Sequence, residues 1–222
     1  MSLNRPELVL VDLDGTMVDT AADLAYATDG MLSKLNLPQQ GEVRVRTWVG
    51  NGVKTLVARA LEGKMKPSPE PELLEQALDI FNILYASVNG VYSQPYAGVI
   101  EGLDWVKSQN INLACITNKA EEFTLPLLKA KGLEDYFSLV ISGDSLPKKK
   151  PDPMPLLHAA KHFNVDPKKS LMIGDSTNDV KAARAAGFKI LCVTYGYNHG
   201  QDIRLSNPDA ILDSLEQIDG LF

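Results

Sequence analysis

Val9-Leu10-Val11-Asp12-Leu13-Asp14-Gly15-Thr16 is the stretch of sequence that decides the fold. Its apolar half is short and rich in Val and Leu, which predicts one buried strand of a parallel sheet. Two aspartates follow where the strand becomes a loop, and in open α/β sheets ligands bind at that carboxyl edge. A strand end with solubilising acids and a glycine turn is the alternative, so the rest of the chain has to decide.

The composition is that of an ordinary globular protein with a sizeable hydrophobic core. There are 28 acidic and 22 basic residues, a net charge of -6, and the longest basic run is Lys148-Lys149-Lys150, so we expect no nucleic-acid partner. Because no apolar run is long enough for a membrane span or a signal peptide, we expect a cytoplasmic protein with no membrane partner. Cys115 and Cys192 lie in apolar runs and are predicted to be free and buried.

Helical periodicity dominates the segment that follows the first strand. Three stretches place apolar residues at helical spacing: 21–37, 53–61 and 73–85. No strand pattern occurs between residues 17 and 92, and this segment is far longer than a crossover between parallel strands needs. We therefore predict a helical domain over residues 18–92, inserted into a core domain of residues 1–17 and 93–222.

From Pro95 onward, strand patterns alternate with helical patterns. The predicted strands are short apolar segments at 111–117, 138–142, 170–174, 189–194 and, more weakly, 210–212. The helical patterns between them span 100–109, 123–131, 153–163 and 177–186. With the first strand, this alternation predicts an α/β fold with a doubly wound parallel sheet.

Three further polar clusters are expected at the carboxyl edge of this sheet. They are Thr117-Asn118, Lys150-Pro151 and the segment Gly174-Asp175-Ser176-Thr177-Asn178-Asp179. Each alone is compatible with a helix cap, a solvated loop or a strand-to-helix turn. Their order and their placement after successive strands predict that all three converge on the site of Asp12 and Asp14.

With these four clusters the chain resembles the haloacid dehalogenase superfamily of aspartyl-phosphate phosphatases. The matching motifs are D-L-D-G-T at 12–16, T-N at 117–118, K-P at 150–151 and G-D-S-x-x-D at 174–179. The resemblance implies a Rossmann-like core in which Asp12 is the nucleophile and Asp14 the general acid and base. Dehalogenases of this fold lack the second aspartate, so Asp14 favours phosphoryl transfer.

The resemblance also implies a Mg²⁺ ion. Its ligands would be the side chains of Asp12 and Asp175 and the main-chain carbonyl of Asp14, hard oxygen donors of the kind that Mg²⁺ prefers. The cation would offset the repulsion between a carboxylate nucleophile and the phosphate. Asp179 is expected to orient Lys150 or a metal-bound water rather than to bind the ion.

The transferring phosphoryl oxygens require donors of their own. Thr117 and Lys150, with Asn118 beside them, are implied as the groups that bind these oxygens, where charge is spread in the transition state. The ammonium of Lys150 would also offset the negative charge of the neighbouring carboxylates.

The helical insertion resembles the α-helical cap that some members of the superfamily carry between the first and second motifs. Residues 46–52 and 143–147 look like the corresponding sequences of bacterial phosphoglycolate phosphatases. In that family a His often follows the Lys-Pro motif, whereas this chain has Asp152.

A Gly50-Asn51-Gly52 loop opens one of the predicted cap helices. Its free backbone N–H groups are expected to meet the carboxylate of the substrate when the cap closes. Arg46 and Lys54 are weaker candidates for the same partner, and a simple helix-entry turn is the alternative interpretation.

The sequence thus predicts a Mg²⁺-dependent phosphatase that converts 2-phosphoglycolate to glycolate and phosphate through an aspartyl-phosphate. The alternatives are hydrolysis of another small phosphate ester or of pyrophosphate, a transfer like that of β-phosphoglucomutase, and a non-catalytic binding module. The expected partner is a small phosphorylated metabolite, and the protein is expected to be a monomer or a homodimer.

Overall fold

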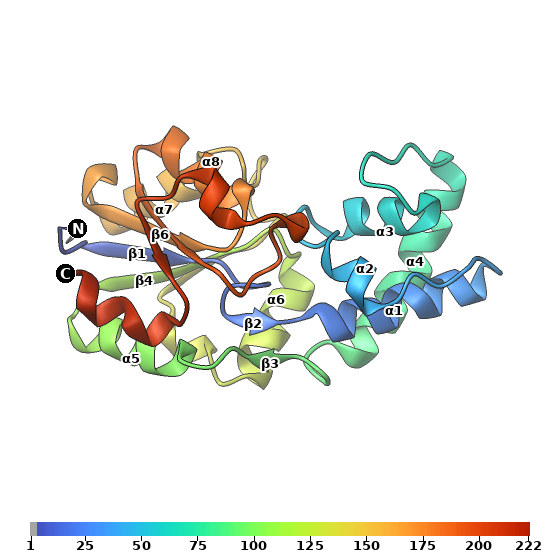
Figure 1. The fold of residues 1–222 in the computed structure, drawn as a ribbon, viewed down its shortest axis with the longest axis horizontal. Coiled ribbons are helices and arrows are strands. Elements are labelled where there is room, and N and C mark those ends of the chain that lie inside the picture. Colours follow the sequence, from blue (N-terminus) through green and yellow to red (C-terminus); the bar gives the residue numbers. More distant parts are fainter. Residues whose placement is uncertain (1–3) are drawn as a thin grey trace.

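A six-stranded parallel sheet forms the centre of the larger part of the molecule in this computed structural model, which describes residues 4–222 (Figure 1). The strand order is β5-β4-β1-β6-β7-β8. The strands are β1 (Leu8–Val11), β4 (Asn112–Ile116), β5 (Leu139–Ile141), β6 (Ser170–Gly174), β7 (Lys189–Val193) and β8 (Ala210–Leu212). The predicted doubly wound parallel sheet is therefore confirmed, and β1 lies at its middle between β4 and β6.

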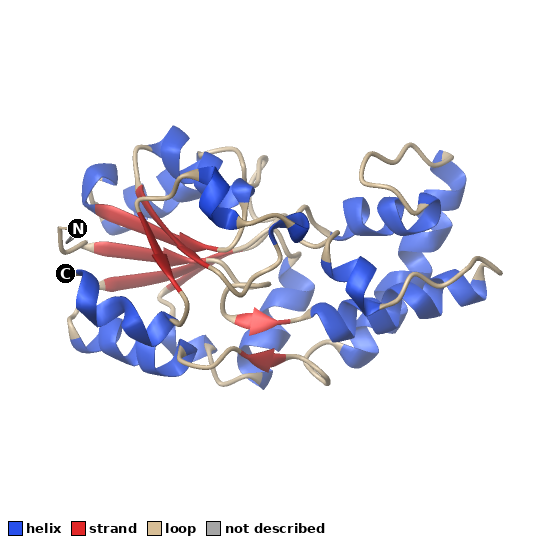
Figure 2. Ribbon diagram, viewed as in Figure 1, coloured by secondary structure: helices blue, strands red, loops and turns tan. Residues whose placement is uncertain are grey.

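Both faces of the sheet are covered by helices (Figure 2), which explains the uninterrupted apolar sequence of β1. Val9 and Val11 pack into one apolar cluster with α5 (Val99–Ser108) and α6 (Glu121–Ala130). Leu8 and Leu10 point the other way, as alternation along a strand requires. They pack with α7 (Met154–Phe163) and α8 (Thr177–Ala186).

The smaller part of the molecule is a group of four helices beside the carboxyl edge of the sheet (Figure 1). They are α1 (Ala21–Lys34), α2 (Glu42–Arg46), α3 (Val53–Glu62) and α4 (Pro71–Val88). α2 was not predicted, because five residues are too short to show a helical period. These helices enclose a second apolar cluster that includes Met31, Leu56 and Phe81. Phe123 and Tyr197, from the larger part, pack into the same cluster.

A two-stranded antiparallel sheet joins the two parts of the molecule. It pairs β2 (Val18–Asp19) with β3 (Gln94–Pro95). The expectation of no strand between residues 17 and 92 is therefore wrong for β2, since a two-residue strand leaves no periodic signal. The predicted domain boundaries lie next to these two strands and stay a prediction.

Asp23, in the first turn of α1, links the two segments through which the chain passes between the core and the helical part. Its side chain is fully buried and accepts hydrogen bonds from the backbone N–H groups of Gly90, Tyr92 and Ser93 and from the Ser93 hydroxyl. The start of the helical part is thereby fixed to the segment that leads back to the core.

The remaining helical elements are short 3₁₀ turns, namely η1 (Glu134–Tyr136), η2 (Pro167–Lys169), η3 (Asn198–Gly200), η4 (Ile203–Ser206) and η5 (Leu215–Leu221). Cys115 and Cys192 are free and buried, as predicted. Among the helices of residues 4–222, none is both long and apolar enough to cross a membrane.

Candidate active site

The carboxyl ends of β1, β4 and β6 bring the predicted side chains together. Asp12 follows β1, Thr117 follows β4 and Asp175 follows β6. Because β1 pairs with both other strands, these three residues lie at adjacent strand ends. Lys150 reaches the same place from the loop between β5 and α7.

Lys150 holds the centre of the cluster. Its side chain is 2% exposed, and its Nζ lies 2.8 Å from Oδ1 of Asp12 and 2.7 Å from Oδ1 of Asp179. A third bond of 2.7 Å goes to the carbonyl oxygen of Ile116. Burial alone would lower the pKa of Lys150, but Asp12 and Asp179 together outweigh it and raise that pKa. Lys150 is therefore a fixed positive charge, as a buried ammonium with good partners must be.

One oxygen of the Asp12 carboxylate, Oδ1, is held by two neighbours. Oδ1 accepts a hydrogen bond of 2.8 Å from the N–H of Leu13 as well as the contact with Lys150. Burial raises the pKa of Asp12 well above its ordinary value; Lys150 opposes this shift, and the Asp179 and Asp175 carboxylates add to it. The position of the carboxylate is thus fixed. The positive charge of Lys150 does not fully offset burial and the two neighbouring negative charges.

Asp175 is held by two hydrogen bonds, and two glycines approach it closely. Its Oδ1 accepts a bond of 3.2 Å from the Thr16 hydroxyl, and its Oδ2 accepts one of 2.6 Å from the N–H of Tyr197. A Cβ on Gly15, where φ is +84°, would lie 2.6 Å from Oδ2, and a Cβ on Gly196 would lie 2.1 Å from the Asp175 Cβ. Only glycine fits this close approach. Burial, with a neighbouring carboxylate, raises the pKa of Asp175 to about 7.

Asp179 forms hydrogen bonds with the N-cap residue of its own helix and an ion pair with Lys150. Ser176 donates to its Oδ2 through both the backbone N–H, at 3.1 Å, and the hydroxyl, at 2.7 Å, while Oδ1 contacts Lys150. This capping box starts α8. The contact with Lys150 is one of the two alternatives that the sequence predicted for Asp179.

The donor set fits a divalent cation. One oxygen from each of Asp12, Asp175 and Asp179 lies within 4.8 Å of the others. Three carboxylates face the single ammonium of Lys150, so the cluster has an excess of negative charge, and carboxylates are the ligands that Mg²⁺ prefers. Asp179 is fully buried and already ion-paired with Lys150, whereas Asp175, among the described residues, accepts hydrogen bonds from neutral donors alone. Asp12 and Asp175 are therefore the side chains best placed to bind the ion.

Asp14 has different neighbours from Asp12. Its Oδ1 accepts a bond of 2.7 Å from the Thr20 hydroxyl and one of 3.1 Å from Nζ of Lys119. The Lys119 side chain is 2% exposed, and its Nζ also donates to the hydroxyl of Tyr85 at 2.5 Å. Tyr85 belongs to α4. Asp14 is therefore connected to the helical part through two side chains.

A second set of contacts docks the Gly50 loop on the core. The amide of Asn118 donates to the carbonyl oxygens of Gly50 and Lys150, each at 2.9 Å. Asn178 donates to the same Gly50 oxygen at 3.2 Å. Both N–H groups of Asn118 are thus used to join segments, which leaves its side chain a structural role beside the predicted phosphate site.

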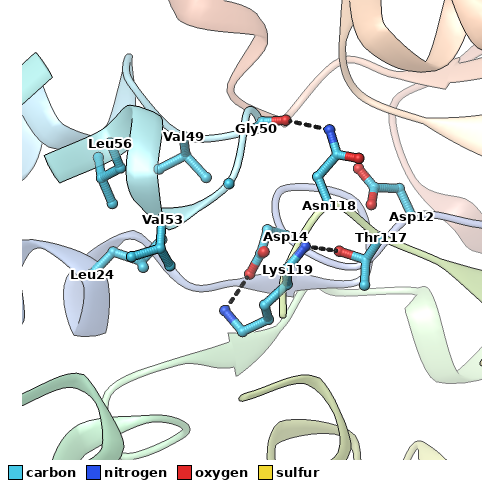
Figure 3. Close-up of a pocket in the computed structure, with 11 residues that line it drawn as sticks. Asp12, Asp14, Leu24, Val49, Gly50, Val53, Leu56, Thr117, Asn118 and Lys119 are labelled. Carbon is cyan, nitrogen blue, oxygen red and sulfur yellow. Dashed lines mark hydrogen bonds and ion pairs between the residues drawn. The ribbon is translucent and has the colours of Figure 1, made fainter. Parts of the chain in front are cut away.

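These contacts close a small cavity of about 30 Å³ between core and helices (Figure 3). Its core side is polar and consists of Asp12, Asp14, Thr117, Asn118 and Lys119. Its helical side is mainly apolar and consists of Leu24, Val49, Gly50, Gly52, Val53 and Leu56. A lining that is polar on one side and apolar on the other is typical of a small-molecule site.

The other predicted cap residues do not line this pocket. The side chain of Asn51 accepts a bond of 2.9 Å from Arg59. Arg46 forms ion pairs with Asp19 at 3.0 Å and with Glu42 at 2.8 Å, and Lys54 is exposed. Of the predicted loop, Gly50 and Gly52 alone lie at the pocket.

Sequence reasoning missed four residues around the two aspartates, namely Thr20, Tyr85, Lys119 and Tyr197. Lys119 carried a usable signal, since it directly follows the Thr117-Asn118 pair. Thr20 lies four residues after the first motif, and Tyr197 belongs to the core loop after β7, but neither position matches a motif. Tyr85 alone is brought to the site by the packing of α4 on the core.

Comparison with known proteins agrees with this geometry. Residues 9–193 match the family model of haloacid dehalogenase-like hydrolases. A phosphoglycolate phosphatase of Nitrosococcus oceani is 56% identical over 99% of this chain and 97% of its own length. One of Thiobacillus denitrificans is 49% identical over 94% and 92%.

Among solved structures, a predicted phosphoglycolate phosphatase of Haemophilus somnus superposes with a TM-score of 0.92 at 36% identity, with 98% of each chain covered. The family expected from the four motifs is confirmed. The chain therefore belongs to the haloacid dehalogenase-like hydrolases, in the group of the phosphoglycolate phosphatases.

Proposed function

We propose that this protein is a phosphoric monoester hydrolase that converts 2-phosphoglycolate to glycolate and phosphate, with the phosphoryl group carried in between on Asp12. The observation that carries the proposal is the separation of two aspartates into two environments. Asp12 is fixed among Lys150, Asp179 and Asp175, whereas Asp14 lies at the pocket beside Lys119. The relatives named phosphoglycolate phosphatase support this choice of substrate.

In the first step an oxygen of Asp12 attacks phosphorus. The bond between phosphorus and the glycolate oxygen breaks, its electron pair stays on that oxygen, and Asp14 supplies the proton that neutralises it. Lys150 and the N–H of Leu13 hold the Asp12 carboxylate in place for this attack. Thr117, at the same end of the pocket, offers its hydroxyl to a phosphoryl oxygen.

In the second step water attacks the phosphorus of the aspartyl-phosphate. Asp14 takes a proton from this water, and the bond between phosphorus and Asp12 breaks, which releases phosphate and restores both side chains. The same group therefore acts first as acid and then as base, and no proton is gained or lost by the protein over the cycle.

We propose Mg²⁺ as the ion held by Asp12, Asp175 and the main-chain carbonyl of Asp14. When bound, the ion supplies positive charge that offsets the repulsion between the Asp12 carboxylate and the phosphate. The excess negative charge of the cluster supports a divalent cation here, because Lys150 alone does not balance three buried carboxylates.

The helical part acts as a lid on this chemistry. Its apolar residues face the reacting groups across the pocket, and a dry site strengthens every electrostatic interaction inside it. Since Gly50 is bonded to the core by Asn118 and Asn178, substrate has to enter while the lid is open.

A substrate panel with Mg²⁺ tests the proposal. We expect the highest kcat/KM for 2-phosphoglycolate, lower values for other small phosphate esters and pyrophosphate, and net release of phosphate throughout. Isomerisation of a hexose phosphate that depends on a bisphosphate, with little free phosphate, would indicate a mutase instead. Binding of 2-phosphoglycolate without turnover would indicate a non-catalytic module.

A further inference from the structure

We infer that Lys119 determines specificity by binding the carboxylate of the leaving group with its buried ammonium. The inference rests on the proposed hydrolysis of 2-phosphoglycolate and deepens it, because it assigns recognition of the glycolate end to one side chain. It also moves that role from the Gly50-Asn51-Gly52 loop, where the sequence placed it, to the core.

The hydrogen bonds of Lys119 leave one donor free. An ammonium has three N–H groups, and in this side chain one goes to Oδ1 of Asp14 and one to the hydroxyl of Tyr85. Within residues 4–222, no third partner of this ammonium is found. Burial of an unpaired donor is costly, so a ligand oxygen at this position would complete the site.

Lys119 adds a cationic side chain to a pocket that also contains the carboxylates of Asp12 and Asp14. Among the described residues that line it, Lys119 is the only Lys or Arg. Leu24, Val53 and Leu56 face it from the helical side, and an ion pair in such apolar surroundings is stronger than one in water. Figure 3 shows the Lys119 side chain running beneath Asp14, with its ammonium turned toward the Asp14 carboxylate.

The first turn of α3 adds to the positive potential of the pocket. Gly52 and Val53, at the beginning of this ten-residue helix, line the pocket. No side chain of the described residues caps this end of the helix, so its N–H groups leave a partial positive charge there.

The position of Lys119 matches the shape of the substrate. In the proposed reaction the glycolate oxygen meets Asp14, and the carboxylate carbon of glycolate is two bonds from that oxygen. The Nζ of Lys119 lies 3.1 Å from Oδ1 of Asp14. The ammonium therefore lies within reach of the carboxylate of a substrate whose bridging oxygen meets Asp14.

Other cations of the helical part have different partners. Arg46 is paired with Asp19 and Glu42. Arg59 is largely buried and donates to the carbonyl of Trp48 and the side chain of Asn51. Neither lines the pocket, so neither competes with Lys119 for the role.

A matched pair of substrates tests the inference. Ethyl phosphate keeps the P–O–CH₂ unit of 2-phosphoglycolate but has a methyl group in place of the carboxylate. In Lys119→Met we expect kcat/KM for 2-phosphoglycolate to fall about 30-fold further than kcat/KM for ethyl phosphate, the size expected for a lost bond between two charged groups. Lys34→Met, an exposed lysine in α1, serves as the control and should change neither value.

Equal losses on the two substrates would overturn the inference and leave Lys119 as a positioning residue for Asp14. A second measurement uses the wild-type protein and so does not depend on the folding of a variant. Glycolate should inhibit ethyl phosphate hydrolysis at least about 10-fold more strongly than neutral glycolamide; equal inhibition by the two would also overturn the inference. Hydrolysis of ethyl phosphate but not of 2-phosphoglycolate by wild type would instead contradict the proposed function.

Discussion

Asp12 and Asp14 are two residues apart in the sequence, yet their surroundings differ in origin and in kind. The contacts of Asp12 all come from the core: Lys150, the N–H of Leu13 and two further carboxylates. Asp14 is bonded to Thr20 and Lys119, and through Lys119 to Tyr85 of α4. This difference indicates that two separate groups of residues serve bond making at phosphorus and protonation of the leaving group.

The two surroundings also predict different responses to substitution. A change around Asp12 should affect every phosphate ester alike, since all of them share the phosphoryl group. A change around Asp14 should depend on the leaving group, because the helical part and Lys119 lie on that side of the pocket.

Asp12→Asn should have the largest effect. The amide cannot form the covalent phosphoryl intermediate, so we expect kcat to fall by at least about 10⁴-fold, the order seen when a nucleophile is removed. The loss should be the same for 2-phosphoglycolate and for ethyl phosphate. Phosphate release under saturating Mg²⁺ is the measurement, and full activity in this variant would rule out Asp12 as the nucleophile.

Lys150→Met should follow, with losses in both activity and stability. Asp12 and Asp179 would lose their shared ammonium at 2.8 and 2.7 Å, and breaking a buried ion pair costs about 3–5 kcal/mol. We expect a fall in kcat of about 10³-fold and a lower midpoint in urea unfolding. A variant that is less stable but turns over at nearly the normal rate would show that Lys150 serves the fold alone.

Tyr85→Phe should have a smaller effect that depends on the substrate. The ring still packs on Phe81 and Phe123, but the hydroxyl that accepts from Lys119 is lost. Loss of one such bond costs about 3- to 10-fold in kcat/KM. We expect the larger loss on 2-phosphoglycolate, because Lys119 becomes less well oriented. A loss of the same size on ethyl phosphate would contradict the separation of tasks.

Asn178→Ala should have the smallest effect. It removes one of the two side chains that hold the Gly50 carbonyl, at 3.2 Å, and leaves Asn118 in place. We expect KM to rise about 2- to 3-fold with kcat nearly unchanged. Asn118→Ala is the matched comparison and should raise KM more, since its bond to Gly50 is shorter at 2.9 Å. The reverse order would show that Asn178 is the main contact of the loop.

The surroundings of Asp12 were largely predictable from the sequence. Asp12, Thr117, Lys150 and Asp175 each lie directly after a strand or in a loop at one sheet edge, so strand order alone brings them together. The α/β sheet was predictable for the same reason, since the apolar run of β1 has to be buried on both faces.

The surroundings of Asp14 could not be derived in this way. Tyr85 is far from Asp14 in the sequence, and it reads as one more apolar position in the helical pattern of α4. Its hydroxyl reaches Lys119 because α4 packs on α6 through Phe123, a tertiary contact without periodic signal. That the N–H groups of the Gly50 loop meet the substrate stays a prediction, and the bonds of the Gly50 carbonyl to the core had no sequence signal.

Acetyl phosphate provides the most direct test of the two tasks, because acetate leaves without needing a proton and is similar in size to glycolate. In Asp14→Asn, attack by Asp12 on acetyl phosphate should proceed, while water is no longer activated. Mass spectrometry after an acid quench should therefore find one phosphoryl group per chain, located on Asp12, and none in Asp12→Asn. Turnover of acetyl phosphate by Asp14→Asn at the wild-type rate, or a phosphoryl group on another residue, would contradict the account.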